Sequence, residues 1–166
     1  MLHVRYTARD GGQALREGAL AALNSAIDSA EGVGSVRLFS LRLDFPMEWE
    51  RLQTDPPAGQ RREIALELQP EHYPFWARGR LASIQRATVI AGADAGPVPA
   101  FAVADKAGLA DAGAKRDALA PSGRFPGLAA GDLVNVALPT PTGTLRLYLE
   151  GPRPADLWLA LTWSGS

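Results

Sequence analysis

The sequence predicts a mainly β fold, an antiparallel β-sandwich that carries one amphipathic helix at about residues 13–31 and short helical turns. Three observations lead to this prediction. Seven or eight short segments alternate apolar and polar residues with a period of two, which is typical of half-buried strands. Gly and Pro residues that favour turns separate these segments. No alternation of strand, helix and strand is sustained, which disfavours a doubly wound parallel sheet.

The first two predicted elements are a strand and the helix. Leu2 to Arg9 alternates strictly, and Asp10-Gly11-Gly12 ends it. The helix ends at Gly32 and Gly34. Its apolar stripe recurs at helical spacing and consists of Leu20, Leu23, Ile27 and Ala30.

In the middle of the chain, the sequence predicts two strands with a short helix between them. Val36 to Phe45 alternates and is expected to be a strand, and Pro46 suits the first turn of a helix that carries Trp49 and Leu52. Residues 53–60 form a predicted loop. Ile64 to Leu68 then shows the cleanest alternation in the chain.

The remaining predicted strands are Arg80 to Ala91, Thr144 to Leu149 and Ala155 to Trp163. Residues 92–131 are rich in Ala and Gly, and we interpret them as a loop excursion with one short strand near Ala100 to Ala104. No linker is long enough to separate two domains, so we expect residues 1–166 to form a single β-sandwich-like domain. A strand at the second residue is unusual for a gene start, and we expect the chain to be an excerpt of a longer one.

Composition excludes several classes of function. The formal net charge of -1 provides no basic field for nucleic acid. The chain contains no cysteine, which excludes disulfides and thiol catalysis. Neither a secretory signal nor a run of apolar residues long enough to span a membrane is present in this sequence.

The search for catalytic and metal-binding residues finds no convincing constellation. His3 and His72 are the two histidines, too few for most metal sites, and we predict no metal, no cofactor and no catalytic residue. The four aspartates of the 92–131 segment lack the spacing of a calcium loop, and we interpret them as solvated charges. Glu63 and Glu67 lie too far apart on one strand face for a retaining glycosidase, although an inverting pair stays open. A hydrolase that uses His72 with Glu71 or with a loop aspartate is an alternative.

The most distinctive feature is an aromatic cluster around two turns that begin with proline. Flat rings bury area at low entropic cost, so this cluster could bind a protein or a sugar, as in a lectin-like module. The competing interpretation is that the rings cap the open end of the core, and it is favoured for Trp49 and Phe75. The candidate binding residues are Trp49, His72, Tyr73, Phe75, Trp76 and Arg78.

Three stretches of the sequence resemble a known family. LHVRYTARDGG (Leu2 to Gly12) resembles the strand that closes the C-terminal domain of the A subunit of bacterial Tc (ABC-type) insecticidal toxin complexes. RLFSLRLDFPMEWERL (Arg37 to Leu52) and LELQPEHYPFWARGR (Leu66 to Arg80) resemble the extension that follows this strand in longer A-subunit-like proteins. The terminal DLWLALTWS (Asp156 to Ser164) is more loosely similar to the last strand of that extension.

The resemblance implies a piece of a secreted toxin assembly with a role in virulence. In that family the A subunit forms the translocation channel, and its C-terminal domain docks the β-propeller of the B component. We therefore expect a non-enzymatic binding or assembly domain. Its partners would be the B component, the remainder of the A subunit, or the target-cell surface and its glycans.

Overall fold

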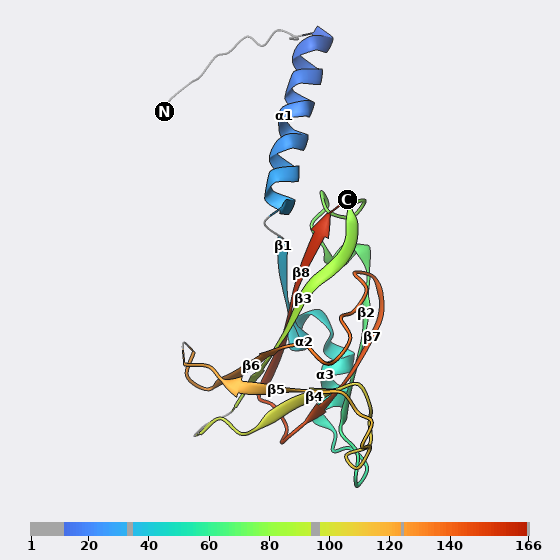
Figure 1. Ribbon diagram of the computed structural model, residues 1–166, viewed down its shortest axis with the longest axis vertical. Coiled ribbons are helices and arrows are strands. Elements are labelled where there is room, and N and C mark those ends of the chain that lie inside the picture. The colour runs from blue at the N-terminus through green and yellow to red at the C-terminus, as the bar shows by residue number, and fades with distance from the viewer. Residues whose placement is uncertain (1–11, 33–34, 94–96, 124, 166) are drawn as a thin grey trace, which may run out of the picture. The chain divides into compact units, whose positions relative to one another are not determined.

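The computed structural model describes residues 12–32, 35–93, 97–123 and 125–165 (Figure 1). The chain divides into two compact units, Met1–Val33 and Gly34–Ser166, where the sequence predicted a single domain. The first unit contains α1 (Gly12–Gly32), so the predicted helix at 13–31 is confirmed to within one residue at each end. The strand predicted at Leu2 to Arg9 lies outside the described residues.

The second unit is mainly β, as predicted. Its described strands form one antiparallel sheet in the order β1-β8-β3-β6-β5-β4-β7-β2. The sandwich is not confirmed, because these strands are hydrogen-bonded in one continuous order and not in two separate sheets. The strands are β1 (Ser35–Ser40), β2 (Arg62–Leu68), β3 (Leu81–Gly92), β4 (Phe101–Ala104), β5 (Arg116–Pro121), β6 (Leu128–Asp132), β7 (Gly143–Glu150) and β8 (Asp156–Gly165).

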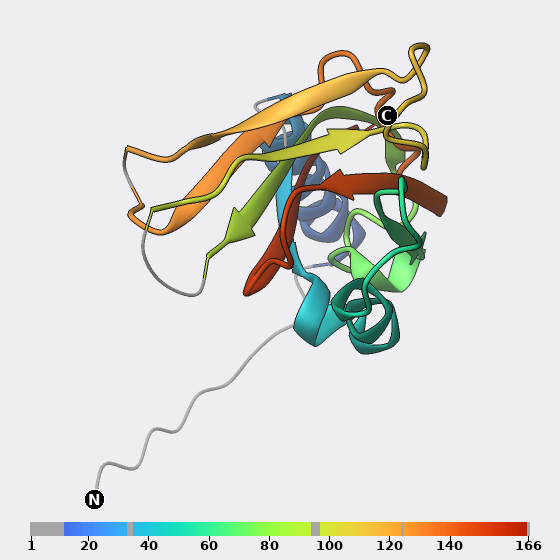
Figure 2. The same cartoon turned by 90° about the horizontal axis from the view of Figure 1, so that it is seen from below.

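The sheet curls so that its two ends face each other across the core (Figure 2). Leu66 of β2 lines the same small internal space as Val89 of β3 and Leu159 of β8. The alternate residues of β2, β7 and β8 that point to this side are buried, as the period-two pattern requires. One hydrophobic core therefore fills the concave side of the sheet.

Two short helices connect the two edge strands of the sheet. α2 (Leu41–Asp44) contacts β1 and β8, and α3 (Pro46–Gln53) contacts β2. α3 begins at Pro46 and buries Trp49 and Leu52, as predicted. A 3-10 helix, η1 (Pro70–His72), lies in the aromatic turn. The helices thus cover the opening between the ends of the curled sheet.

The strand predicted at Val36 to Phe45 is too long, because it stops at Ser40 and continues as α2. The Asp44 carboxylate accepts a hydrogen bond of 2.7 Å from the Ser40 backbone N–H, and the Ser40 hydroxyl accepts one of 3.4 Å from the Leu43 N–H. These two bonds satisfy backbone donors at the helix start. Leu41, Leu43 and Phe45 continue the period-two alternation, so the sequence pattern does not indicate the change from strand to helix at Ser40.

The segment 92–131 is not a loop excursion. The short strand expected near Ala100 to Ala104 is confirmed as β4, but the sequence analysis missed β5 and β6 in the same segment. These strands consist largely of Ala, Gly, Pro and Asp, which have low β-propensity. Pairing with their neighbours in the sheet holds them in place.

Candidate functional site

The structure separates the aromatic candidates into buried and exposed residues. Trp49 and Tyr73 are buried in the core, with 8% and 2% of their surface exposed. The Tyr73 ring packs edge-on against Trp163 at 5.2 Å, and its hydroxyl donates a hydrogen bond of 2.6 Å to the Pro141 carbonyl. Burial raises the pKa of the Tyr73 hydroxyl to about 12. These two rings stabilise the fold and are not part of an open platform.

Phe75 behaves in the opposite way. Its side chain is 82% exposed, although the sequence favoured a place in the core for it. Trp76 is half-buried and lies near Trp163, with ring centroids 6.4 Å apart. Arg78 is exposed, and its Nε donates to the Tyr73 carbonyl at 3.4 Å. The exposed candidate side chains of this turn are therefore Phe75, Arg78 and, in part, Trp76.

The His72 side chain contacts the backbone of η1 and two aromatic rings of the core. Its Nδ1 accepts a hydrogen bond of 3.2 Å from the backbone N–H of Gln69, which closes the first turn of η1. Its ring packs edge-on against Phe39 and Phe45, with centroids 6.0 Å and 5.1 Å apart. Because Nδ1 accepts the hydrogen bond from Gln69, the proton of the neutral imidazole lies on Nε2.

The carboxylates singled out in the sequence have partners of their own. Glu63 pairs with Arg146 at 3.1 Å, and Glu67 accepts a hydrogen bond of 2.6 Å from the Thr144 hydroxyl. Within the part of the chain that the structure describes, no three His, Asp or Glu side chains gather in a group that could hold a metal ion. No described helix is both long and apolar enough to cross a membrane.

Asp117 is not a solvated charge, as the sequence suggested, but a buried one with 6% of its surface exposed. Its carboxylate accepts hydrogen bonds of 2.9–3.1 Å from the backbone N–H groups of Val134, Asn135 and Val136. Burial by itself raises the pKa of Asp117, but these donors, with the Asn135 amide, outweigh burial and lower it. Asp117 thus fixes the loop that follows β6.

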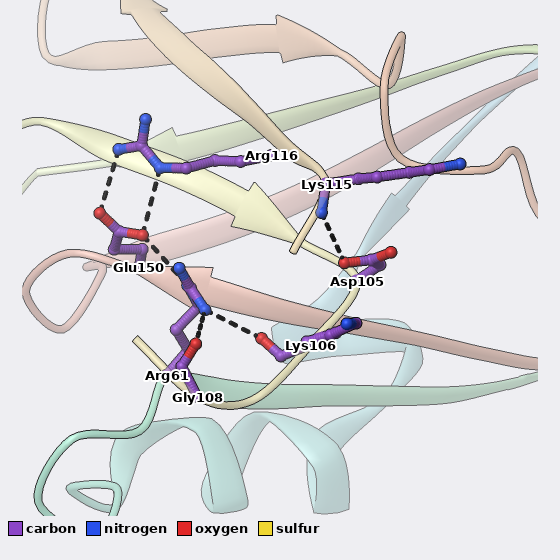
Figure 3. A network of polar contacts seen from close by, with 7 residues as sticks. All are labelled: Arg61, Asp105, Lys106, Gly108, Lys115, Arg116 and Glu150. Carbon is purple, nitrogen blue, oxygen red and sulfur yellow. Dashed lines mark hydrogen bonds and ion pairs between the residues drawn. The ribbon is translucent and has the colours of Figure 1, made fainter. Parts of the chain in front are cut away.

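A second polar network joins three distant segments (Figure 3). The Nε of Arg61 donates to Glu150 at 3.0 Å, and Arg116 donates to both carboxylate oxygens of Glu150, at 3.0 and 3.2 Å. The Nη1 of Arg61 also donates to the carbonyls of Lys106 and Gly108. The hydrogen bonds from Arg116, together with those from Arg61, lower the pKa of Glu150 against the effect of burial. This network joins β7 to β5 and holds the β4–β5 loop in place.

An apolar surface outside the core lies on the convex side of the sheet. On β1, Val36 and Leu38 point away from the core and are 63% and 52% exposed. The strand register places Leu38 beside Ala160 of β8, and Trp158 of β8 beside Ile90 of β3. Ala130 of β6 continues the row beyond Ile90. We call this set the outer patch; its members are Val36, Leu38, Ile90, Ala130, Trp158 and Ala160.

The outer patch has a polar border. Arg86 and Asp132 form an ion pair at 3.7 Å, and the Thr88 hydroxyl donates to Asp132. All members of the patch other than Val36 and Leu38 are half-buried. The sequence analysis missed this patch, although a signal was present. In β8 the residues opposite the leucine face include Trp158 and Ala160, where a strand facing water would carry polar residues.

Comparisons of the chain with protein-family models, with curated proteins and with solved structures find no match.

Proposed function

We propose that this chain is a non-enzymatic binding domain that takes part in the assembly of a Tc-toxin-like A subunit with its partners. The observation that carries the proposal is the outer patch. An apolar surface that spans several strands and has a polar border is characteristic of protein-binding surfaces. The sequence resemblance to the extension of A-subunit-like proteins indicates the kind of assembly.

The composition of the outer patch supports a protein partner. Trp158 presents a large ring near the middle of the patch, and tryptophan is enriched among residues that dominate binding energy. Val36 and Leu38 add exposed aliphatic area at the β1 side. The Arg86–Asp132 pair lies at the opposite side, where rim contacts provide register and specificity.

The B component of a toxin complex is the first partner to test. Isothermal titration of the full 166-residue chain with that component should give saturable binding. The variant Val36→Arg places a charge in the patch on an exposed side chain and should weaken binding at least about tenfold without changing the melting temperature. Val134→Arg is the matched control, because Val134 is 79% exposed and lies outside the patch.

Two results would count against this function. Val36→Arg and Val134→Arg could bind the partner equally well, which would remove the outer patch from the interface. The unmodified chain could also fail to bind both the B component and the remainder of the A subunit. In that case, recognition of the target-cell surface becomes the leading interpretation.

A lectin-like function is a second candidate, and the exposure of Phe75 beside Trp76 favours it. Exposed aromatic faces stack against the apolar faces of sugars. A glycan array probed with the chain and with Phe75→Ser tests this candidate. Binding that the substitution abolishes would support it, and an array without signal above background would exclude it.

A further inference from the structure

A pocket of about 340 Å³ lies beside the start of β2, apart from the outer patch. α3 provides Glu48 and Arg51 to its lining, the loop before β2 provides Thr54 and Asp55, and β7 provides Tyr148. Arg61 and Arg62 also line it. Two adjacent arginines that are both more than nine-tenths buried are unusual, because buried charges need partners.

The hydrogen bonds of Arg61 hold the fold together. Its side chain donates to Glu150 and to the carbonyls of Lys106 and Gly108, which fixes the β4–β5 loop (Figure 3). The charge of Arg61 is therefore paired with Glu150 within the fold.

Arg62 differs from Arg61 because one edge of its guanidinium is only half used. Its Nη1 donates to the Thr54 carbonyl at 2.8 Å, and its Nη2 donates to Asp55 at 2.7 Å. Its Nε is buried and has no hydrogen-bond partner among the described residues. The N–H groups of Nε and Nη2 project from the same edge, which is the edge that grips both oxygens of a carboxylate in a bidentate pair.

Asp55 binds only one of the two donors on this edge of Arg62. It makes one hydrogen bond to Arg62, and its side chain is 90% exposed, so it can turn into solvent at little cost. The hydrogen bond from Arg62 holds the pKa of the Asp55 carboxyl below its ordinary value. The position beside Arg62 thus already favours an ionised carboxylate over its protonated form.

We propose that this pocket is a carboxylate-binding site, in which an incoming carboxylate displaces Asp55 and takes both the Nε and the Nη2 donors of Arg62. The gain is a second charge-assisted hydrogen bond to a donor that is otherwise buried without a partner. Glu48 and Glu63 line the same pocket and disfavour a doubly charged anion such as phosphate. The ligand is therefore a singly charged carboxylate, on a small organic acid or on an acidic side chain.

The test uses NMR of the full chain labelled with ¹⁵N-arginine, in which the Nε–H signal of Arg62 is assigned by its loss in Arg62→Lys. Titration with acetate, with the capped peptide acetyl-Gly-Asp-Gly-amide and with inorganic phosphate should shift that signal for the two carboxylates and not for phosphate. Tighter binding of the capped peptide than of acetate would identify an acidic side chain as the source, and the reverse would identify a small acid.

The decisive variant is Asp55→Asn, which removes the competing carboxylate but keeps an oxygen acceptor for Nη2. It should bind acetate about tenfold more tightly than the unmodified chain. Glu63→Gln is the matched control, because it removes one negative charge from the same pocket, and Glu63 pairs with Arg146 and not with Arg62.

Equal effects of Asp55→Asn and Glu63→Gln would overturn the proposal, because general electrostatics would then explain the gain. A titration that shifts the exposed Arg51 but leaves the Nε–H of Arg62 unchanged would also overturn it. Stronger binding of phosphate than of either carboxylate would contradict the assigned ligand class.

Discussion

Arg61 and Glu150 lie 89 positions apart in the sequence, yet the Nε of Arg61 donates a hydrogen bond of 3.0 Å to the Glu150 carboxylate. Only 4% of the Arg61 side chain is exposed, so this guanidinium depends on Glu150 for its charge partner. Because Arg116 donates to the same carboxylate, Glu150 joins β7 to β5 and to the residue that precedes β2.

Replacement of Glu150 by Gln should destabilise the second unit by about 2–3 kcal/mol, because it leaves a buried guanidinium without a counter-charge. Urea unfolding followed by tryptophan fluorescence measures this, since the four tryptophans all lie within Gly34–Ser166. Glu63→Gln is the control, because its pair with Arg146 is exposed and should contribute less than about 1 kcal/mol. Equal losses for the two variants would contradict the structural role given to Glu150.

Replacement of Asp117 by Asn should lower the free energy of unfolding by about 3 kcal/mol at pH 7. The backbone N–H groups after β6 bind both oxygens of the carboxylate, and an amide would leave them only one acceptor oxygen. The pKa of Asp117 is lowered in the folded chain, so the folded state binds fewer protons than the unfolded state in acid. Its contribution is therefore complete above the unfolded pKa of about 4 and is lost as the pH falls through the lowered value.

Urea unfolding at pH 7 and at pH 3 checks both parts of the Asp117 prediction. The difference in stability between Asp117→Asn and the unmodified chain should shrink in acid. A difference that is the same at both pH values would show that the carboxylate charge contributes nothing to holding the loop after β6.

Tyr73 should make the fold sensitive to alkali. Its pKa is raised to about 12, so the unfolded chain loses the hydroxyl proton near pH 10 while the folded chain keeps it. Stability should therefore fall between pH 10 and 12. Tyr73→Phe should remove this part of the alkaline loss and cost about 1 kcal/mol at pH 7, through the hydrogen bond to Pro141.

Melting curves from pH 8 to pH 11.5 check the Tyr73 prediction, with Tyr148→Phe as a control that keeps Tyr73 in place. An alkaline loss in Tyr73→Phe as large as in the unmodified chain would contradict it.

The strands that the sequence predicts well are those with one face in the core. In β2 and β8 every second residue is buried, so tertiary packing and local pattern agree. β5 and β6 escaped prediction because their sequences, RDALAP and LAAGD, carry almost no pattern and depend on neighbouring strands for pairing. The sandwich prediction followed from strand number, which does not distinguish two sheets from one curled sheet.

The candidate site was harder to predict than the fold, because burial within the aromatic turn depends on contacts far along the chain. Tyr73 and Phe75 are two positions apart and equally apolar to a local analysis. Tyr73 is buried, and its hydroxyl donates a hydrogen bond to the carbonyl of Pro141, 68 positions away. Phe75 is exposed. The burial of Arg61 and Arg62 was missed for the same reason. Arg61 is paired with Glu150, which is distant in the sequence, so no local pattern indicates that Arg61 is buried.

Gly131 is the residue that permits the close approach of β6 to β5. A Cβ atom at this position would lie 2.6 Å from the Ala118 carbonyl oxygen and 3.2 Å from the Leu119 Cα, and both are backbone atoms that cannot turn away. Gly131→Ala should therefore destabilise the second unit by about 2–3 kcal/mol.

Gly79→Ala is the matched control, because a Cβ atom there meets no atom within 4 Å and the backbone is not in the left-handed region. Its effect should be within about 1 kcal/mol of zero or slightly stabilising. Urea unfolding of the two variants decides the matter: if Gly131→Ala is as stable as Gly79→Ala, then β5 has room to move away from β6, and position 131 does not require a glycine.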